Sequence, residues 1–122
     1  MFENLRFQPS IINLAILEEF TDGNEDLFSD MLKIFFLQVP NFTNDMEEAF
    51  KAKDYLKLGQ IAHKAKSSVA TMGISNLSVK MKEFEILAKS GEKPESYRQY
   101  IDLFKDTCQK AIAELEVIKS NL

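Results

Sequence analysis

His63 is the residue of this 122-residue chain best suited to chemistry, and it is the only histidine. A neutral imidazole is a nucleophile near physiological pH, so an accessible histidine can take up a phosphoryl group and pass it on. Phosphorylation adds close to two negative charges, which a nearby lysine would offset. Lys64 and Lys66 lie on either side of the site, and we predict both as site residues. Lys66, one helical turn along, is the better candidate for offsetting the charge, because Lys64 points around the helix away from the ring.

The position of His63 on its predicted helix favours the protein surface over the core. Each residue advances about 100° around a helix, so His63 lies roughly 140° from Leu58, the centre of the apolar stripe. The other residues on this face are mostly small: Gly59, Gln60, Ser67 and Ala70. Small side chains would let a partner approach the ring, so we predict a binding surface here. Gly59 could equally serve helix packing, and the serine and alanine could simply be tolerated.

Amphipathic helices are expected on both sides of His63. Apolar residues recur at helical spacing over about 14–20, 25–53, 55–72, 76–90 and 95–120. Only four glycines and three prolines are present, too few for the turns of an all-β domain. The pattern predicts one all-α domain over residues 1–122. We expect an antiparallel up-down-up-down four-helix bundle with a short additional N-terminal helix.

Polar caps, glycines and one proline mark the predicted helix ends. The expected N-caps are Asn13 or Ser10, Asn24, Asp54 and Ser75. Gly73 and Gly91 are expected to end the helices before them. Pro40 interrupts the helix over 25–53, but the apolar stripe keeps its phase, so we expect one bent helix. Phe36 and Leu37 lie off that stripe, and we expect them to pack against the N-terminal helix rather than to form a docking surface.

Charges are distributed unevenly along the chain. The net charge is −4, but residues 1–50 hold ten acids and two bases, whereas residues 51–93 hold nine lysines and four acids. An acidic chain argues against a nucleic-acid partner, and its basic middle third indicates an acidic partner or an anionic group. Neither a membrane-spanning run nor a signal-peptide pattern is evident. The single cysteine, Cys108, excludes an internal disulfide and fits a reducing cytoplasm.

The segment from His63 to Gly73 resembles the signature of histidine-containing phosphotransfer (Hpt) domains. That signature has a histidine, then Leu-Lys-Gly, a small residue or two, and a glycine ten positions after the histidine. The residues that fit are His63, Lys66, Ser68 and Gly73, followed by Leu77 and the pair Phe84-Glu85 in the next helix. Ala65 replaces the usual leucine, and Ser67 replaces the usual glycine beside the docking surface. The resemblance covers about residues 25–118.

The resemblance implies a phosphorelay intermediate. Such domains accept a phosphoryl group from a receiver-domain aspartate, here on His63, and donate it to another receiver. Lys66 would offset the phosphoryl charge, Glu85 would orient the imidazole and Lys89 would add positive charge. Glu85 and Lys89 could instead be a plain surface ion pair. The expected partners are receiver domains of response regulators or hybrid sensor kinases; no cofactor is expected, and the divalent metal would belong to the receiver.

Two other classes of function compete with this interpretation. A helical-bundle adaptor that binds a receiver or another signalling protein without phosphotransfer would share the fold and the basic face. A hydrolase or metalloenzyme is poorly supported, because one histidine, a core cysteine and no convergent pair of acids leave little from which to build a site. We predict a phosphoryl carrier without its own ATP site rather than an enzyme. We expect it to be a cytoplasmic monomer that binds neither nucleic acid nor membrane.

Overall fold

Helices make up all of the regular structure. The computed structural model describes residues 1–122 and contains no strand. Its helices are α1 (Leu14–Thr21), α2 (Glu25–Lys51), α3 (Tyr55–Thr71), α4 (Ser75–Ser90) and α5 (Tyr97–Ser120), with a short 3-10 helix, η1 (Pro94–Ser96), before α5. The all-α prediction is confirmed, and the predicted helix ends differ from the observed ones by at most two residues.

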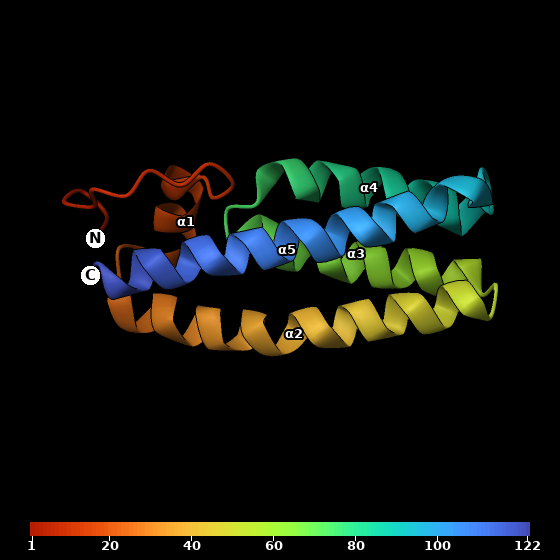
Figure 1. Ribbon diagram of the computed structural model, residues 1–122, viewed down its shortest axis with the longest axis horizontal. Coiled ribbons are helices and arrows are strands. Elements are labelled where there is room, and N and C mark those ends of the chain that lie inside the picture. The colour runs from red at the N-terminus through yellow and green to blue at the C-terminus, as the bar shows by residue number, and fades with distance from the viewer.

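The four long helices lie side by side, each antiparallel to the one before it in the chain (Figure 1). α2 and α5, of 27 and 24 residues, span the whole length, whereas α3 and α4, of 17 and 16 residues, end short of it. α1 and the segment before it fill the end that α3 and α4 leave open, beside both termini (Figure 1). This is the predicted four-helix bundle with an additional N-terminal helix.

Side-chain caps explain where three of the helices begin. Asn13, Asn24 and Asp54 each accept a hydrogen bond from the backbone N–H three residues on, at 3.2, 2.9 and 3.2 Å. The prediction that Ser75 caps α4 is wrong, because α4 begins at Ser75 and Ile74 takes the cap position without a side-chain hydrogen bond. Ile74 is buried in the core, which draws the chain inward and starts the helix one residue earlier than expected.

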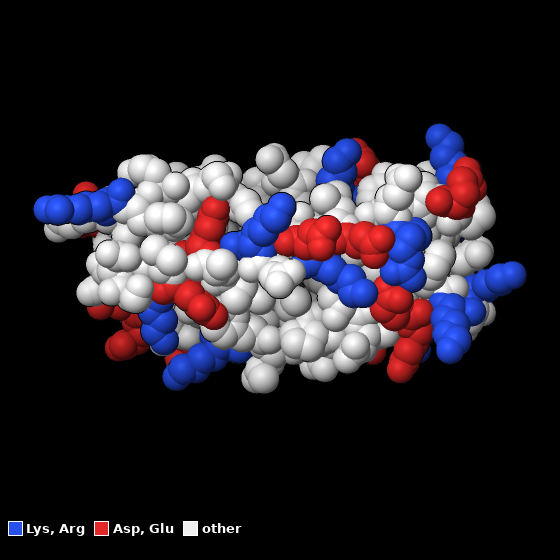
Figure 2. Space-filling view, viewed as in Figure 1, with Lys and Arg blue, Asp and Glu red and all other residues white.

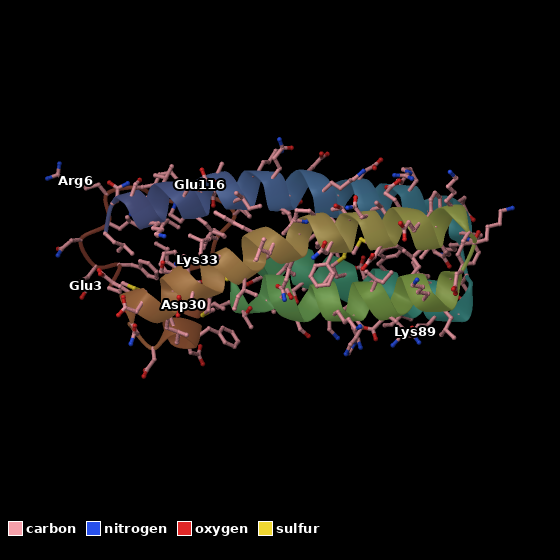
Figure 3. The ribbon with its side chains drawn as sticks, turned by 90° about the horizontal axis from the view of Figure 1, so that it is seen from below. Glu3, Arg6, Asp30, Lys33, Lys89 and Glu116 are labelled. Atoms are coloured by element: carbon pink, nitrogen blue, oxygen red, sulfur yellow. The ribbon has the colours of Figure 1, made fainter.

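α2 continues through Pro40 as one helix, as expected from its unbroken apolar stripe. The helix changes direction along its length (Figure 3), which fits the hydrogen bond that proline cannot donate. Leu37 is 72% exposed, so its predicted packing against the N-terminal helix is wrong. α1 has only eight residues and lies at the end of the bundle where α2 begins (Figure 1). Phe36, by contrast, is partly buried against the core.

The core runs along the bundle between the helices. The predicted stripe of the third helical segment is buried throughout: Leu58, Ile61, Ala62, Ala65, Val69 and Met72. α3 and α4 approach each other so closely that a Cβ at Gly59 would lie 3.0 Å from the backbone nitrogen of Lys89 and 3.1 Å from the carbonyl oxygen of Glu85. The absence of a side chain at Gly59 therefore sets how closely α3 and α4 pack. These two helices support the candidate site.

Residues 1–13, the N-terminal strap, lie across the end of the bundle (Figure 1). Glu114 of α5 accepts hydrogen bonds from the three backbone N–H groups of residues 10–12 at 2.9 to 3.0 Å. Burial raises the pKa of Glu114, but these backbone hydrogen bonds outweigh burial and hold the pKa below its usual value. The N–H of Asn13 also donates to the carbonyl oxygen of Gly73 at 2.8 Å. The strap is therefore tied both to α5 and to the turn between α3 and α4.

Acidic and basic side chains lie next to one another over the face that α5 presents (Figure 2). Arg98 of α5 forms a bidentate pair with Glu47 of α2 at 2.6 and 3.0 Å, and it contacts Asp102 at 3.2 Å. These contacts tie α5 to α2. None of the helices combines the length and the apolar character needed to cross a membrane.

Candidate functional site

His63 lies in the middle of α3 with its ring toward solvent. Its side chain is 54% exposed, whereas the adjacent Ala62 is fully buried. This orientation agrees with the helix phase calculated from the sequence. The ring is therefore open to a partner molecule, as the ring of a core histidine would not be.

One edge of the His63 ring faces Glu85 of α4. Nδ1 of His63 lies 3.0 Å from Oε2 of Glu85, within hydrogen-bond distance. The Glu85 side chain is only 7% exposed, so its carboxylate lies in the contact between α3 and α4 rather than in solvent. The close packing of the two helices thus places a buried acceptor behind an exposed imidazole.

Three lysines surround the carboxylate of Glu85. Lys66 lies 3.3 Å from Oε1, Lys82 lies 4.0 Å from the same oxygen, and Lys89 lies 2.8 Å from Oε2. Lys66 and Lys89 were predicted from the sequence, but Lys82 was not, although its position three residues before Glu85 was an available signal. With His63 neutral, the three ammonium groups and one carboxylate give this group, the Glu85 cluster, a net charge of +2.

The surroundings of Glu85 keep its carboxylate ionised. Burial raises the pKa of Glu85, but hydrogen bonds from Lys89, His63 and Lys66 outweigh burial and lower the pKa to about 2. An ionised carboxylate can only accept hydrogen bonds, so Nδ1 of His63 must be the donor. In the neutral ring the lone pair then belongs to Nε2, the nitrogen remote from Glu85. The arrangement provides one defined nucleophilic atom.

The residues around this site also match a known family model. Residues 30–116, which include all of α3 and α4, match the model of the Hpt domain. The chain belongs to the Hpt domain family. Hpt domains are phosphocarrier modules of two-component signalling rather than catalysts, and they interact with receiver domains in phosphorelays. No curated protein and no solved structure matches the chain.

The remaining predicted site residues of this Hpt domain differ in accessibility. Gln60, Lys64 and Ser67 are exposed, and Ala70 is partly buried. Gly59 is buried, and a Cβ at this position would lie 2.6 Å from Cγ of Lys89. The expectation that Gly59 opens the surface to a partner is therefore wrong. The alternative, a role in helix packing, is what its position between α3 and α4 supports.

A shallow hollow of about 260 Å³ lies between α2 and α3, beside the site. Its lining residues include Met31, Ile34 and Phe35 from α2 and Ser67, Ser68 and Thr71 from α3. Ser67 is one turn after His63, and Ile34 is 55% exposed. The hollow was not predicted from the sequence, because helix periodicity does not specify which two helices meet. The local signal was the apolar Ile34, which lies off the buried stripe of α2 and is exposed together with Leu37.

Cys108 is a core residue, as predicted. It is buried in α5, and burial raises the pKa of its thiol to about 12. A thiol with so high a pKa is a poor nucleophile at neutral pH. In this Hpt domain no group of three or more His, Cys, Asp or Glu side chains lies close enough together to hold a metal ion.

Proposed function

We propose that this Hpt domain accepts a phosphoryl group on Nε2 of His63 from the aspartyl phosphate of one receiver domain and donates it to the aspartate of another. The observation that carries the proposal is the 3.0 Å contact between Nδ1 of His63 and the ionised Glu85. This contact leaves Nε2 as the nucleophile on a ring that is open to solvent.

The proposed transfer makes one bond and breaks one. The lone pair of Nε2 attacks phosphorus, and the bond from phosphorus to the aspartate oxygen breaks with its electron pair returning to the carboxylate. The imidazole gains positive charge, which the carboxylate of Glu85 stabilises through the Nδ1 proton. In the second transfer an aspartate oxygen attacks phosphorus and Nε2 departs with the electron pair, so that neutral His63 is restored.

The charge of the Glu85 cluster supports a phosphoryl group as the cargo. The cluster has a net charge of +2, and a phosphoryl group adds about −1.5 to −2 at pH 7. Lys66 is one turn after His63, so its mobile ammonium group is within reach of a phosphoryl group on the ring. The phosphoryl group would offset most of the positive charge of the cluster, and this attraction favours retention of the phosphoryl group until a receiver docks.

The lysines also complement the expected partner. The family resemblance implies that a receiver presents a cluster of acids with a divalent metal, and a basic surface favours encounter with it. Ser67 and the hollow between α2 and α3 lie beside His63, where a docked receiver would cover them. We further propose that a response regulator or hybrid sensor kinase supplies both the receiver and the metal. The Hpt domain would act as a cytoplasmic monomer without a cofactor or ATP site.

Label transfer from a receiver tests this proposal. A receiver domain carrying labelled phosphate is mixed with wild type, His63→Gln or Lys80→Gln, with magnesium present. Lys80 is a matched surface lysine, because it pairs with Glu83 at 3.4 Å and not with Glu85. We expect acid-labile, base-stable label on wild type and Lys80→Gln and none on His63→Gln. Undiminished label on His63→Gln would refute the proposal, and absence of label on wild type from a broad panel of receivers would favour an adaptor.

A further inference from the structure

A notch in α3 accommodates the side chain of Lys89. Gly59 lies one turn before His63, and a Cβ there would lie only 2.6 Å from Cγ of Lys89. Any larger residue at this position would displace the Lys89 stem. A glycine inside a helix lowers helix stability relative to alanine, so the close approach is not the default outcome of helix formation.

The two oxygens of Glu85 serve different partners. Oε2 accepts from Nδ1 of His63 at 3.0 Å and from Lys89 at 2.8 Å. Oε1 accepts from Lys66 at 3.3 Å and lies 4.0 Å from Lys82. Lys89 is therefore the one lysine that shares an oxygen with the imidazole, and its contact is the shortest of the three.

Because Lys66 and Lys89 contact different oxygens of Glu85, they can have different roles. Lys66 can leave Oε1 for a phosphoryl group on His63 without disturbing the contact at Oε2. The stem of Lys89 lies against Gly59, and its ammonium group contacts Oε2, the oxygen that orients the ring. The charged and titratable groups that face Glu85 are thus His63 and Lys66 from α3 and Lys82 and Lys89 from α4.

We infer that Lys89, seated in the notch at Gly59, is a positioning residue that holds Oε2 of Glu85 against Nδ1 of His63. The inference rests on the proposed phosphotransfer and adds a residue that acts through Glu85 rather than on the phosphoryl group. It also gives Gly59 a role in the site, because the notch determines where the Lys89 ammonium group lies. Loss of Lys89 should loosen Glu85 and weaken the preference for the tautomer with the proton on Nδ1.

Ring NMR and label transfer together test the inference. Wild type, Lys89→Gln and the control Lys80→Gln are prepared with ¹⁵N-labelled histidine, and native helix content is confirmed by circular dichroism. We expect the His63 ring signals of Lys89→Gln to move toward a mixture of the two tautomers. Phosphoryl acceptance should slow about three- to tenfold, the size expected for weakening one charge-assisted hydrogen bond. Lys80→Gln should match wild type in both measurements.

A second variant tests the notch itself. Gly59→Ala should move the ring signals in the same direction as Lys89→Gln, because the added Cβ would displace the Lys89 stem and would also press on the backbone at Glu85 and Lys89. Ring signals and rates of Lys89→Gln that match those of Lys80→Gln would overturn the inference. The ring spectra are recorded without any phosphate donor. They therefore decide the role of Lys89 even if wild type takes up no label, a result that would count against the phosphotransfer proposal instead.

Discussion

Glu85 is buried and Glu114 is partly buried, and their carboxylates accept hydrogen bonds from different kinds of donor. Burial raises the pKa of both, and hydrogen bonds lower both below the usual value. Glu85 accepts from side chains, namely His63, Lys66 and Lys89. Glu114 accepts from the backbone of residues 10–12 and from the Ser10 hydroxyl. Figure 3 shows Lys89 toward one end of the molecule and Glu3 and Arg6 of the strap at the other.

Because its partners are mobile side chains, the site at Glu85 can rearrange when a new charge arrives, whereas Glu114, with backbone partners, has a structural role. Backbone N–H groups belong to a segment whose position is set by the fold, so Glu114 can only keep the strap in place. Lysine ammonium groups turn on flexible stems, so Lys66 can leave Glu85 when a new negative charge arrives. An exposed histidine beside a carboxylate that is held by lysine side chains is therefore the place to expect group transfer.

Replacing the carboxylate of Glu85 should have the largest effect. In Glu85→Gln the amide no longer favours one tautomer of His63 and no longer stabilises positive charge on the ring. We expect phosphoryl acceptance to fall about 10- to 100-fold, the range seen when the group that orients a functional imidazole is removed. Initial rates of label transfer from a phosphorylated receiver measure this. If the rate were unchanged, Glu85 would be an ordinary ion-pair residue and the contrast with Glu114 would disappear.

Gly73 tests how firmly the strap is fixed. Its φ is 79°, and a Cβ there would lie 2.7 Å from the carbonyl oxygen of Asn13. Gly91 has a φ of 70° with nothing within 4 Å, so it is a matched control. We expect Gly91→Ala to cost about 1 kcal/mol for the left-handed backbone and Gly73→Ala to cost about 2–3 kcal/mol, because the strap must also move. Urea unfolding gives both values, and equal losses would mean that the strap yields freely.

Glu114→Gln should lower stability while leaving phosphotransfer intact. The change removes the charge that strengthens the hydrogen bonds to residues 10–12, and we expect a loss of about 1–2 kcal/mol in the free energy of unfolding. Label transfer by the folded variant should stay within twofold of wild type. A transfer defect comparable to that of Glu85→Gln would show that the strap and the site are coupled.

The dependence of stability on acid pH should reveal how strongly the folded protein stabilises the ionised form of Glu85. The pKa of Glu85 is about 2 in the native protein, against 4.5 for the ordinary side chain, so the unfolded chain binds the extra proton as the pH falls below 4.5. Its contribution to stability is therefore present above pH 4.5 and is lost as the pH falls toward 2. Glu85→Gln should lose less stability than wild type across this window. Parallel losses in pH-dependent urea unfolding would contradict the assigned pKa shift.

Features that depend on neighbours within a helical turn were predictable from the sequence. Asn24 and Asp54 cap helices as expected, and the phase of His63 relative to Leu58 places its ring on the surface. The pairing of His63 with Glu85 followed from the family motif rather than from periodicity. Ser75 shows the limit of local patterns, because burial of the preceding isoleucine decided where α4 begins.

Features that depend on distant segments were not predictable. Glu114 and Ser10 are 104 residues apart in the chain, and nothing in either local sequence indicates their hydrogen bonds. The contact of Gly59 with Lys89 depends on how closely two helices approach, which helix periodicity does not specify. Leu37 remained exposed because the short α1 lies elsewhere on the bundle. Packing between helices, rather than the helices themselves, determined these details.

The central claim is that Glu85 occupies Nδ1 of His63, so that Nε2 carries the phosphoryl group. The most direct test is NMR of the ¹⁵N-labelled protein after phosphorylation by a receiver, using ³¹P–¹⁵N couplings to identify the phosphorylated ring nitrogen. We predict a single phosphohistidine at position 63 with phosphorus on Nε2 and a proton retained on Nδ1. Phosphorus on Nδ1, or on any residue other than His63, would contradict the account.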